Sequence, residues 1–297
     1  KCEISVNLPV RIDHANLEYQ RMGRHDVSRQ SIFFEPNIWL RGNAWEIKAK
    51  MNSELPDLTT MVNYRDDSNP MNIILGNMQL RNIHYYDIEG GKTFEGKKHS
   101  RLNINMGYHQ TDNAVAYSLV FDKQTGVSTV QPISVNGNYR IDLGIGYTRP
   151  LDKKEKLSID NQASFNYNHN VDMAMVQGAT QSQRSIVNNW KISNVLRLNY
   201  RLDDNYEFTL HGGGTYYLIK SQREGFSNIH AGDYNIGVNV QVALPWKLQL
   251  TTDLTMFARR GYQLSEMNTT DWIWNAQLSR SFINKKLLVK LQGFDIL

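Results

Sequence analysis

The sequence predicts an all-β fold: an antiparallel, up-and-down transmembrane β-barrel. Nearly every stretch between turn residues alternates large apolar with small or polar residues. In residues 234–244, Tyr, Ile, Val and Leu fall on one face, and Asn, Gly, Gln and Ala fall on the other. Such segments reach the ~9–11 residues that a tilted membrane strand needs. From residue 139 onward, short turns alternate with longer loops, as in a barrel with short periplasmic turns and long external loops.

Composition agrees with this fold. A mean hydropathy of -0.51 does not exclude a barrel, because alternation hides its hydrophobicity. No run approaches the ~18 apolar residues of a membrane helix, so a helical membrane protein is excluded. The net charge is +4, and no basic cluster is interleaved with aromatic residues, so we expect no nucleic-acid partner. Cys2 is the single cysteine, which excludes an internal disulfide and a cysteine-based zinc site.

The N-terminal part begins with alternating segments that are broken by turn residues. Gly42-Asn43 marks a hairpin turn, and Glu95-Gly96-Lys97-Lys98 marks a second turn. We expect residues 113–121 to continue the preceding strand past a bulge. The predicted strands are 4–19, 31–41, 45–55, 81–90 and 101–109, with a polar loop at 21–30 and a long segment at 56–80.

The C-terminal part consists of paired segments that flank short polar turns. These turns are 150–156, 203–205, 245–246 and 284–286. The flanking strands are 139–147 with 157–167, 190–200 with 206–219, 234–244 with 248–257, and 272–282 with 287–297. We count about thirteen strands, the first and last running outward, whereas bacterial single-chain barrels have even strand numbers. The sequence therefore predicts part of a larger barrel.

Aromatic residues gather near the predicted strand ends, as expected for the two interfaces of a bilayer. Tyr and Trp prefer the headgroup level because one part of the ring is apolar and the other can form hydrogen bonds. Those near short turns are Trp45, Tyr147, Tyr200, Tyr206, Trp246 and Phe282. Those near long loops are Tyr167, Tyr216, Tyr234 and Trp272.

Enzyme and metal motifs are incomplete in this chain. The string at 211–214, His-Gly-Gly-Gly, matches an oxyanion-hole motif of lipases, but no Gly-x-Ser-x-Gly accompanies it. Residues 66–69 could offer oxygen ligands to calcium, yet a polar turn before Pro70 explains them more simply. His109, His169 and His230 fall near the outer rim without a recognisable Ser/Asp arrangement. We expect no catalytic group, no cofactor and no metal.

Several short segments resemble TonB-dependent transporters of the outer-membrane β-barrel class. They are 55–58 (Leu-Pro-Asp-Leu), 64–70 (Tyr-Arg-Asp-Asp-Ser-Asn-Pro), 75–80 (Leu-Gly-Asn-Met-Gln-Leu), 122–126, 136–139, 244–246, 260–262, 274–276 and 294–297. They span most of the chain in the expected order. Met78 stands where that class commonly has proline.

The resemblance implies a barrel of about 22 strands, a plug in its lumen and a short box that contacts TonB. Residues 1–297 would then be one partial barrel domain, without the plug, with roughly eight strands missing before it and one after it. The implied function is uptake of a scarce nutrient across the bacterial outer membrane. The implied partners are outer-membrane lipids and the TonB energy-coupling complex. The sequence leaves open whether a surface lipoprotein covers the barrel.

Ligand contacts are expected in the long external loops, which are 56–80, 122–138, 168–188, 221–233 and 261–271. Within them we select Tyr64, Arg65, Arg184 and Arg223 as ligand-binding candidates. The main alternative is a non-energised structural or secretion-associated barrel, because fold does not fix function. An outer-membrane hydrolase is a less favoured alternative. A soluble β-sandwich or adhesin would have shorter strands, around five or six residues.

Overall fold

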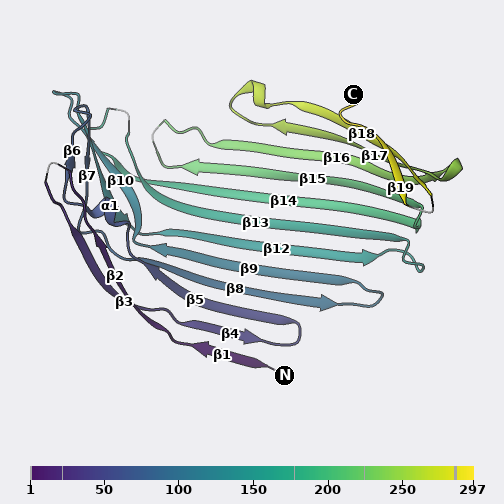
Figure 1. Cartoon of the computed structure of the whole chain (residues 1–297), viewed down its shortest axis with the longest axis horizontal. Helices are drawn as coiled ribbons and strands as arrows, with labels where there is room; N and C mark the ends of the chain where they lie inside the picture. The colour runs from purple at the N-terminus through teal and green to yellow at the C-terminus, as the bar shows by residue number, and fades with distance from the viewer. Residues whose placement is uncertain (1, 22, 177, 224, 284–285) are drawn as a thin grey trace.

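The computed structural model describes residues 2–21, 23–176, 178–223, 225–283 and 286–297. Most of this part of the chain forms one 13-stranded sheet with the order β1-β4-β5-β8-β9-β12-β13-β14-β15-β16-β17-β18-β19. Every neighbouring pair in that sheet is antiparallel. Figure 1 shows the long strands side by side in a curved wall, with the smaller elements gathered at one end. In the described part of the chain, no helix is long and apolar enough to cross a membrane.

The elements of the large sheet are β1 (Glu3–Asn7), β4 (Asn37–Arg41), β5 (Trp45–Glu54), β8 (Ile83–Glu95), β9 (Arg101–Asp112), β12 (Asn138–Pro150), β13 (Leu157–Ala174), β14 (Gln183–Asp203), β15 (Tyr206–Ser221), β16 (Ile229–Leu244), β17 (Leu248–Arg260), β18 (Thr270–Phe282) and β19 (Leu287–Gly293). The smaller elements are β2 (Val10–Leu17), β3 (Val27–Phe34), α1 (Leu58–Met61), β6 (Arg65–Asp66), β7 (Asn72–Leu75), β10 (Ala114–Phe121) and β11 (Ser128–Val135). Two 3-10 turns span Pro245–Lys247 and Ser265–Met267.

The register of the sheet separates an apolar face from a polar face, as the alternation predicts. On one face, Val238 lies opposite Leu210 and Leu254. On the other face, Asn239 lies opposite Thr209 and Asp253. The apolar face is not covered by other elements in the described chain, and Ile236 on it is 52% exposed. A large uncovered apolar face indicates a surface that contacts another apolar phase or molecule.

Aromatic rings form a row on the apolar face, near the end of the sheet where the long connections lie. Tyr108, Tyr139, Tyr167 and Trp190 come from four neighbouring strands, with successive ring centroids 6.1, 5.8 and 5.1 Å apart. Rings at these distances attract one another through offset or edge-to-face contacts. The row lies at the end where an aromatic belt is expected, although Tyr167 is the one member of the row among the four residues predicted there.

The long connections fold into a small compact unit at one end of the wall, which we name the cap (residues 17–21, 23–29, 55–82 and 113–137). It contains α1, a four-stranded sheet of order β10-β11-β7-β6, and the tip of the β2–β3 hairpin. In that small sheet β11 pairs with β7 in parallel. Val27, Met61, Val62 and Leu80 form its buried core. Asp57 starts α1 by accepting a hydrogen bond from the Thr59 amide at 2.9 Å, an ordinary N-cap.

Several predicted boundaries were wrong, mostly because strands extend beyond the membrane-length core. The predicted loop 168–188 is largely strand, since β13 reaches Ala174 and β14 begins at Gln183. The predicted loop 122–138 contains β11, and the predicted loop 21–30 includes the start of β3. Polar strand residues beyond the apolar band still satisfy their backbone groups by pairing, so polarity alone does not end a strand.

Two further predictions need correction. Residues 113–121 do follow β9 directly, but Asn113 has a φ of 58°, and the chain leaves the large sheet there to pair β10 with β11. The predicted strand 287–297 ends at Gly293, because Asp295 has a φ of 49° and the Ile296 amide donates to the Trp274 carbonyl. The predicted turn residues Asn284 and Lys285 lie outside the described residues.

The count of about thirteen strands in the wall is confirmed. The predicted strands 4–19 and 31–41 were wrong as continuous strands: the first divides into β1 and β2, and the second spans the end of β3 and all of β4. β2 and β3 pair with each other outside the large sheet. Within the described residues, β1 is paired only with β4, and β19 only with β18. The two edges of the wall therefore do not close on each other here.

Truncating the core of the cap should destabilise the cap. Leu80 is 2% exposed and packs in the cluster with Met61 and Val62. We expect Leu80→Ala to cost about 2–5 kcal/mol through lost burial and a cavity. Limited proteolysis of the purified protein should then cut the cap at lower protease concentration than in the parent. Leu264→Ala, at a side chain that is 65% exposed, is the matched control and should leave the pattern unchanged.

Candidate functional site

A network of charged side chains crosses the polar face of the wall through β5, β8, β9, β12 and β13. Asp87 accepts a 2.6 Å hydrogen bond from His109 Nδ1, and its other oxygen lies 3.5 Å from Lys50 Nζ. His109 Nε2 lies 3.4 Å from Asp142 Oδ2. Asp142 also accepts from Arg140 Nε at 2.6 Å and from Asn166 Nδ2 at 2.5 Å. The two carboxylates are therefore bridged by one imidazole ring and flanked by one cation each.

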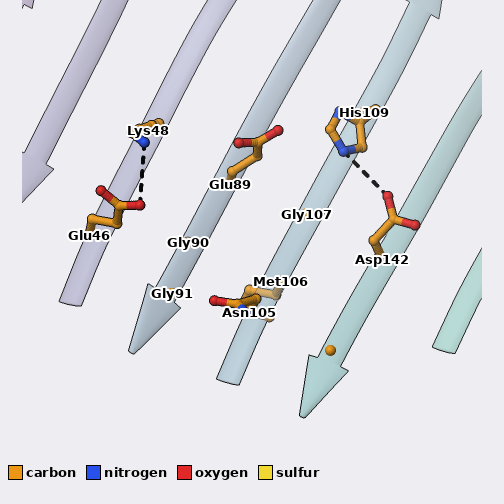
Figure 2. Close-up of a pocket in the computed structure, with 11 residues that line it drawn as sticks. Glu46, Lys48, Glu89, Gly90, Gly91, Asn105, Met106, Gly107, His109 and Asp142 are labelled. Atoms are coloured by element: carbon orange, nitrogen blue, oxygen red, sulfur yellow. Dashed lines mark hydrogen bonds and ion pairs between the residues drawn. The ribbon is translucent and has the colours of Figure 1, made fainter. Parts of the chain in front are cut away.

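Beside this network the polar face is hollowed into a pocket of about 350 Å³. Figure 2 shows the charged side chains around it on neighbouring strands, with Lys48 directed to Glu46 and His109 directed to Asp142. The polar side chains that line the pocket are Glu46, Lys48, Glu89, Asn105, His109 and Asp142. Because the pocket is open and lined by charged side chains, it suits a polar surface laid against it better than an apolar small molecule.

Two glycines make this arrangement possible. Gly107 lies opposite Asp142 in the register, and a Cβ on it would stand 3.0 Å from His109 Nε2. A Cβ on Gly91 would stand 2.6 Å from Asn105 Oδ1. Without side chains at these positions, the His109 ring can lie along β9 and reach Asp142.

We predict that Gly107→Ala separates His109 from Asp142 while His109 keeps its bond to Asp87. Losing one such contact should cost about 1 kcal/mol. The checks are the imidazole nitrogen shifts in ¹⁵N-histidine NMR and the temperature at which the folded barrel band is lost on a gel. Gly144→Ala is the matched control, because a Cβ there meets nothing within 4 Å. Unchanged nitrogen shifts in Gly107→Ala would contradict the role given to this glycine.

An aromatic and charged cluster lies in the cap around Tyr64. The Tyr64 ring is 5.6 Å from the Tyr19 ring and 5.1 Å from the His25 ring, and the Arg21 guanidinium lies 5.8 Å from its centroid. Arg21 also pairs with Asp66 at 2.9 Å. Hydrogen bonds from the Ser68 hydroxyl and amide, helped by Arg21, hold the pKa of Asp66 below its ordinary value. Asp66 therefore keeps its negative charge at mildly acidic pH.

Comparison with known proteins identifies the architecture. A model of the outer membrane protein beta-barrel family matches residues 5–221. This chain belongs to that family. No curated protein matches the sequence.

Membership in the outer membrane protein beta-barrel family places the chain in the bacterial outer membrane. The uncovered apolar face of the wall then contacts lipid, and the polar face lines the lumen. The end that carries the long connections, and with it the cap, is the external end, since long loops of such barrels lie outside the cell. The charged network is therefore luminal, and the Tyr64 cluster is external.

Of the ligand-binding candidates chosen from the sequence, Tyr64 and Arg65 are consecutive residues of the cap, whereas Arg184 and Arg223 lie on or after other strands. Arg65 is exposed in β6, with Nε 3.8 Å from Asp67. Arg184 lies in β14 rather than in a loop, and donates to the Asn136 carbonyl at 3.2 Å. Arg223 is exposed after β15, and its amide donates to Ser221 Oγ at 3.1 Å. In the described residues, no hydrogen bond or ion pair joins Arg184 or Arg223 to the Tyr64 cluster.

The three histidines singled out from the sequence contact carboxylate, amide or phenol groups rather than a serine hydroxyl. His109 bonds carboxylates, as described. His169 stacks on Tyr139 with centroids 4.9 Å apart and bonds Asn188 Oδ1 at 2.7 Å. His230 Nδ1 lies 2.9 Å from the Tyr216 hydroxyl. Among the described residues, no group of three or more His, Cys, Asp or Glu side chains is arranged to hold a metal.

Sequence reasoning missed the luminal network, although a signal for it exists. Charged residues recur at a spacing of two in several predicted strands, as in Lys48 with Lys50, Asp87 with Glu89, and Arg140 with Asp142. Charges at this spacing share one face of a strand. The sequence could have shown a charged luminal stripe, but not which strands meet.

Proposed function

We propose that this chain forms part of the barrel of a TonB-dependent receptor, which takes up a scarce nutrient across the outer membrane. The observation that carries the proposal is the 13-stranded wall whose edge strands, β1 and β19, are each paired on one side only among the described residues. Backbone groups at a sheet edge cannot remain unpaired in lipid, so a barrel that contains this wall needs further strands. Outer-membrane barrels with about 22 strands enclose a plugged lumen.

The luminal network supports a lumen that holds a folded plug. A plug is a polar surface pressed against the wall, and it needs charged and hydrogen-bonding groups fixed in place. Lys50, Asp87, His109, Asp142 and Arg140 are held by one another at the distances given above. In this proposal the pocket bordered by Glu46, Lys48 and Glu89 receives polar side chains of the plug.

The cap supports capture of a nutrient at the external end. It has its own core, so it presents fixed residues rather than loose loops. We propose that Tyr64 offers its ring, and Arg65 its cation, to a polar ligand, with Arg184 and Arg223 as further contacts from the ends of β14 and β15. Through the plug, the receptor would contact the TonB energy-coupling complex. A surface lipoprotein over the cap is a further proposed partner.

The first test measures conductance of the full-length gene product in a planar lipid bilayer. A plugged barrel should pass almost no current, and should open when urea unfolds the plug and leaves the barrel intact. An open channel without urea contradicts a plugged lumen and favours a non-energised barrel. Refolded barrel with the plug deleted is the control for a fully open channel.

The second test concerns energised uptake. We expect deletion of the gene to slow growth on a subset of limiting nutrients, and inactivation of TonB to slow growth on the same nutrients. Restoring the gene with Tyr64→Ala should recover growth only at higher nutrient concentration. Growth that depends on this gene but not on TonB would exclude energised uptake. Loss of surface-bound proteins without a growth defect would favour the structural or secretion-associated alternative.

A further inference from the structure

A recess of about 520 Å³ lies on the lipid-facing side of the wall, across β14, β15, β16 and β17. Its walls include Ile192, Tyr216 and Tyr234, which are large side chains of the apolar face, and Asn194 and His230 also line it. Its floor is formed by Gly214 and Gly232, which lie opposite Tyr234 and Tyr216 in the register. The recess is therefore a gap in the apolar face, where a glycine on each of two neighbouring strands lies opposite a tyrosine on the other.

The backbone does not require glycine at the floor. Neither Gly214 nor Gly232 has a positive φ. A Cβ on Gly214 would come no closer than 3.5 Å to its neighbours, and a Cβ on Gly232 no closer than 3.6 Å, which are ordinary contact distances. A Cβ would fit at both positions, so the two glycines leave open a space on the lipid-facing surface.

The external rim of the recess carries a cation. Arg260 is the last residue of β17 and pairs with Gly232 in the register, so it shares the lipid-facing side. Its Nη1 donates to the Arg259 and Thr269 carbonyls, both at 2.7 Å, and its Nη2 donates to Thr270 Oγ1 at 2.6 Å. These bonds fix the guanidinium but bring no negative charge. In the described chain, no carboxylate forms an ion pair with Arg260.

Arg259, the neighbouring cation on the luminal face, has a different environment. Arg259 Nε lies 3.7 Å from Asp233, and Asp233 also accepts from the Tyr262 hydroxyl at 2.8 Å. At the lipid-facing rim, Tyr216 bonds His230 instead. The carboxylate of Asp233 thus balances the luminal arginine, whereas the lipid-facing arginine stands beside aromatic and imidazole groups.

We propose that this recess binds an anionic, phosphate-bearing lipid of the outer leaflet. Its acyl chain lies over Gly214 and Gly232 between Ile192 and Tyr234, and its phosphate meets Arg260. Tyr216 and Tyr234 stand at the headgroup level, where their rings have both an apolar and a polar neighbour. A basic residue near a membrane surface attracts an anionic headgroup by about 1 kcal/mol. The inference rests on the family's membrane location, not on TonB-dependent uptake.

The test uses native mass spectrometry of the full-length protein released from nanodiscs, with phosphatidylglycerol as the anionic probe and phosphatidylcholine as the zwitterionic control. We expect the parent to retain phosphatidylglycerol about fivefold more strongly than phosphatidylcholine. Arg260→Gln should abolish this preference. Arg259→Gln removes the same charge from the luminal side and should preserve it.

Filling the recess tests the acyl-chain contact. Gly214→Leu should weaken retention of either lipid severalfold, because its side chain would occupy the recess and remove the van der Waals contacts of the acyl chain. Gly212→Leu is the matched control: it lies on the same strand and the same face, outside the recess, and its Cβ would also come no closer than 3.5 Å. Both variants are first checked for a folded barrel band.

Three outcomes would overturn the proposal. One is equal retention in Gly214→Leu and Gly212→Leu. Another is a parent protein that does not discriminate between the two lipids. The third is a dimeric parent that becomes monomeric in Gly214→Leu with its bound lipid unchanged, since the occupant would then be a second copy of the chain. If Gly214→Leu does not fold, the loss of headgroup preference in Arg260→Gln decides the question.

Discussion

Gly76→Ala is expected to disrupt the cap while leaving the transmembrane wall intact. A Cβ at this position would stand 1.8 Å from the Val62 carbonyl oxygen and 2.7 Å from the Val62 carbonyl carbon. These are backbone atoms, so no side-chain rotation can relieve the overlap. Val62 is itself buried in the core of the cap and has little freedom to move.

Hydrogen bonds of the next residue, Asn77, also hold the segment around Gly76 in place. The Asn77 amide donates to the Thr60 carbonyl at 2.8 Å, and the Asn77 side chain donates to the Pro132 carbonyl at 2.9 Å. Shifting Gly76 away from Val62 would break these bonds. We therefore expect a cost of about 3–5 kcal/mol, in the range of the most damaging single substitutions.

Protease added to intact cells measures this effect. The cap should be cut in Gly76→Ala under conditions in which the parent resists, and the barrel should still migrate as a folded band before heating. Met78→Ala is the matched control, two residues away at a side chain that is 54% exposed. A protease-resistant Gly76→Ala cap would contradict the packing described here.

Asp142→Ala is expected to be the most damaging change in the luminal network. Asp142 accepts hydrogen bonds from Arg140 and Asn166 and lies 3.4 Å from His109 Nε2, so its removal leaves the first two donors without this acceptor. The carboxylate is partly solvated by the lumen, which reduces the cost, and we expect about 1–3 kcal/mol. The temperature at which the folded barrel band disappears is the measurement.

A luminal carboxylate with a simpler environment provides the control. Asp253 accepts from Asn275 Nδ2 at 3.0 Å, and no ion pair to it exists among the described residues. Asp253→Ala should lower the transition temperature less than Asp142→Ala. If a plug docks on the network, Asp142→Ala should in addition raise the bilayer current of the full-length protein. Equal transition temperatures in the two variants would contradict the prediction that Asp142 stabilises the barrel more than Asp253 does.

The sequence was sufficient to predict the wall. Residues 234–244 and 248–257, with the turn at Pro245-Trp246, correspond to β16, its turn and β17. This succeeds because side chains alternate with period two, and a sheet with lipid on one side and water on the other must repeat that pattern in every strand. In the C-terminal part, the short turns also indicated neighbours such as β16 and β17, since a turn of two or three residues joins adjacent antiparallel strands.

Only the tertiary structure decided the cap and the luminal network. The cap is built from residues distant in sequence, such as Val27 and Leu80, and its parallel β11–β7 pair has no local signature. The network depends on register: Asp87, His109 and Arg140 meet because β8, β9 and β12 are staggered by particular amounts. Alternation tells which face a side chain occupies, but slipping a strand by two residues preserves the face and changes every partner. Faces were therefore determined by the sequence, and contacts by the fold.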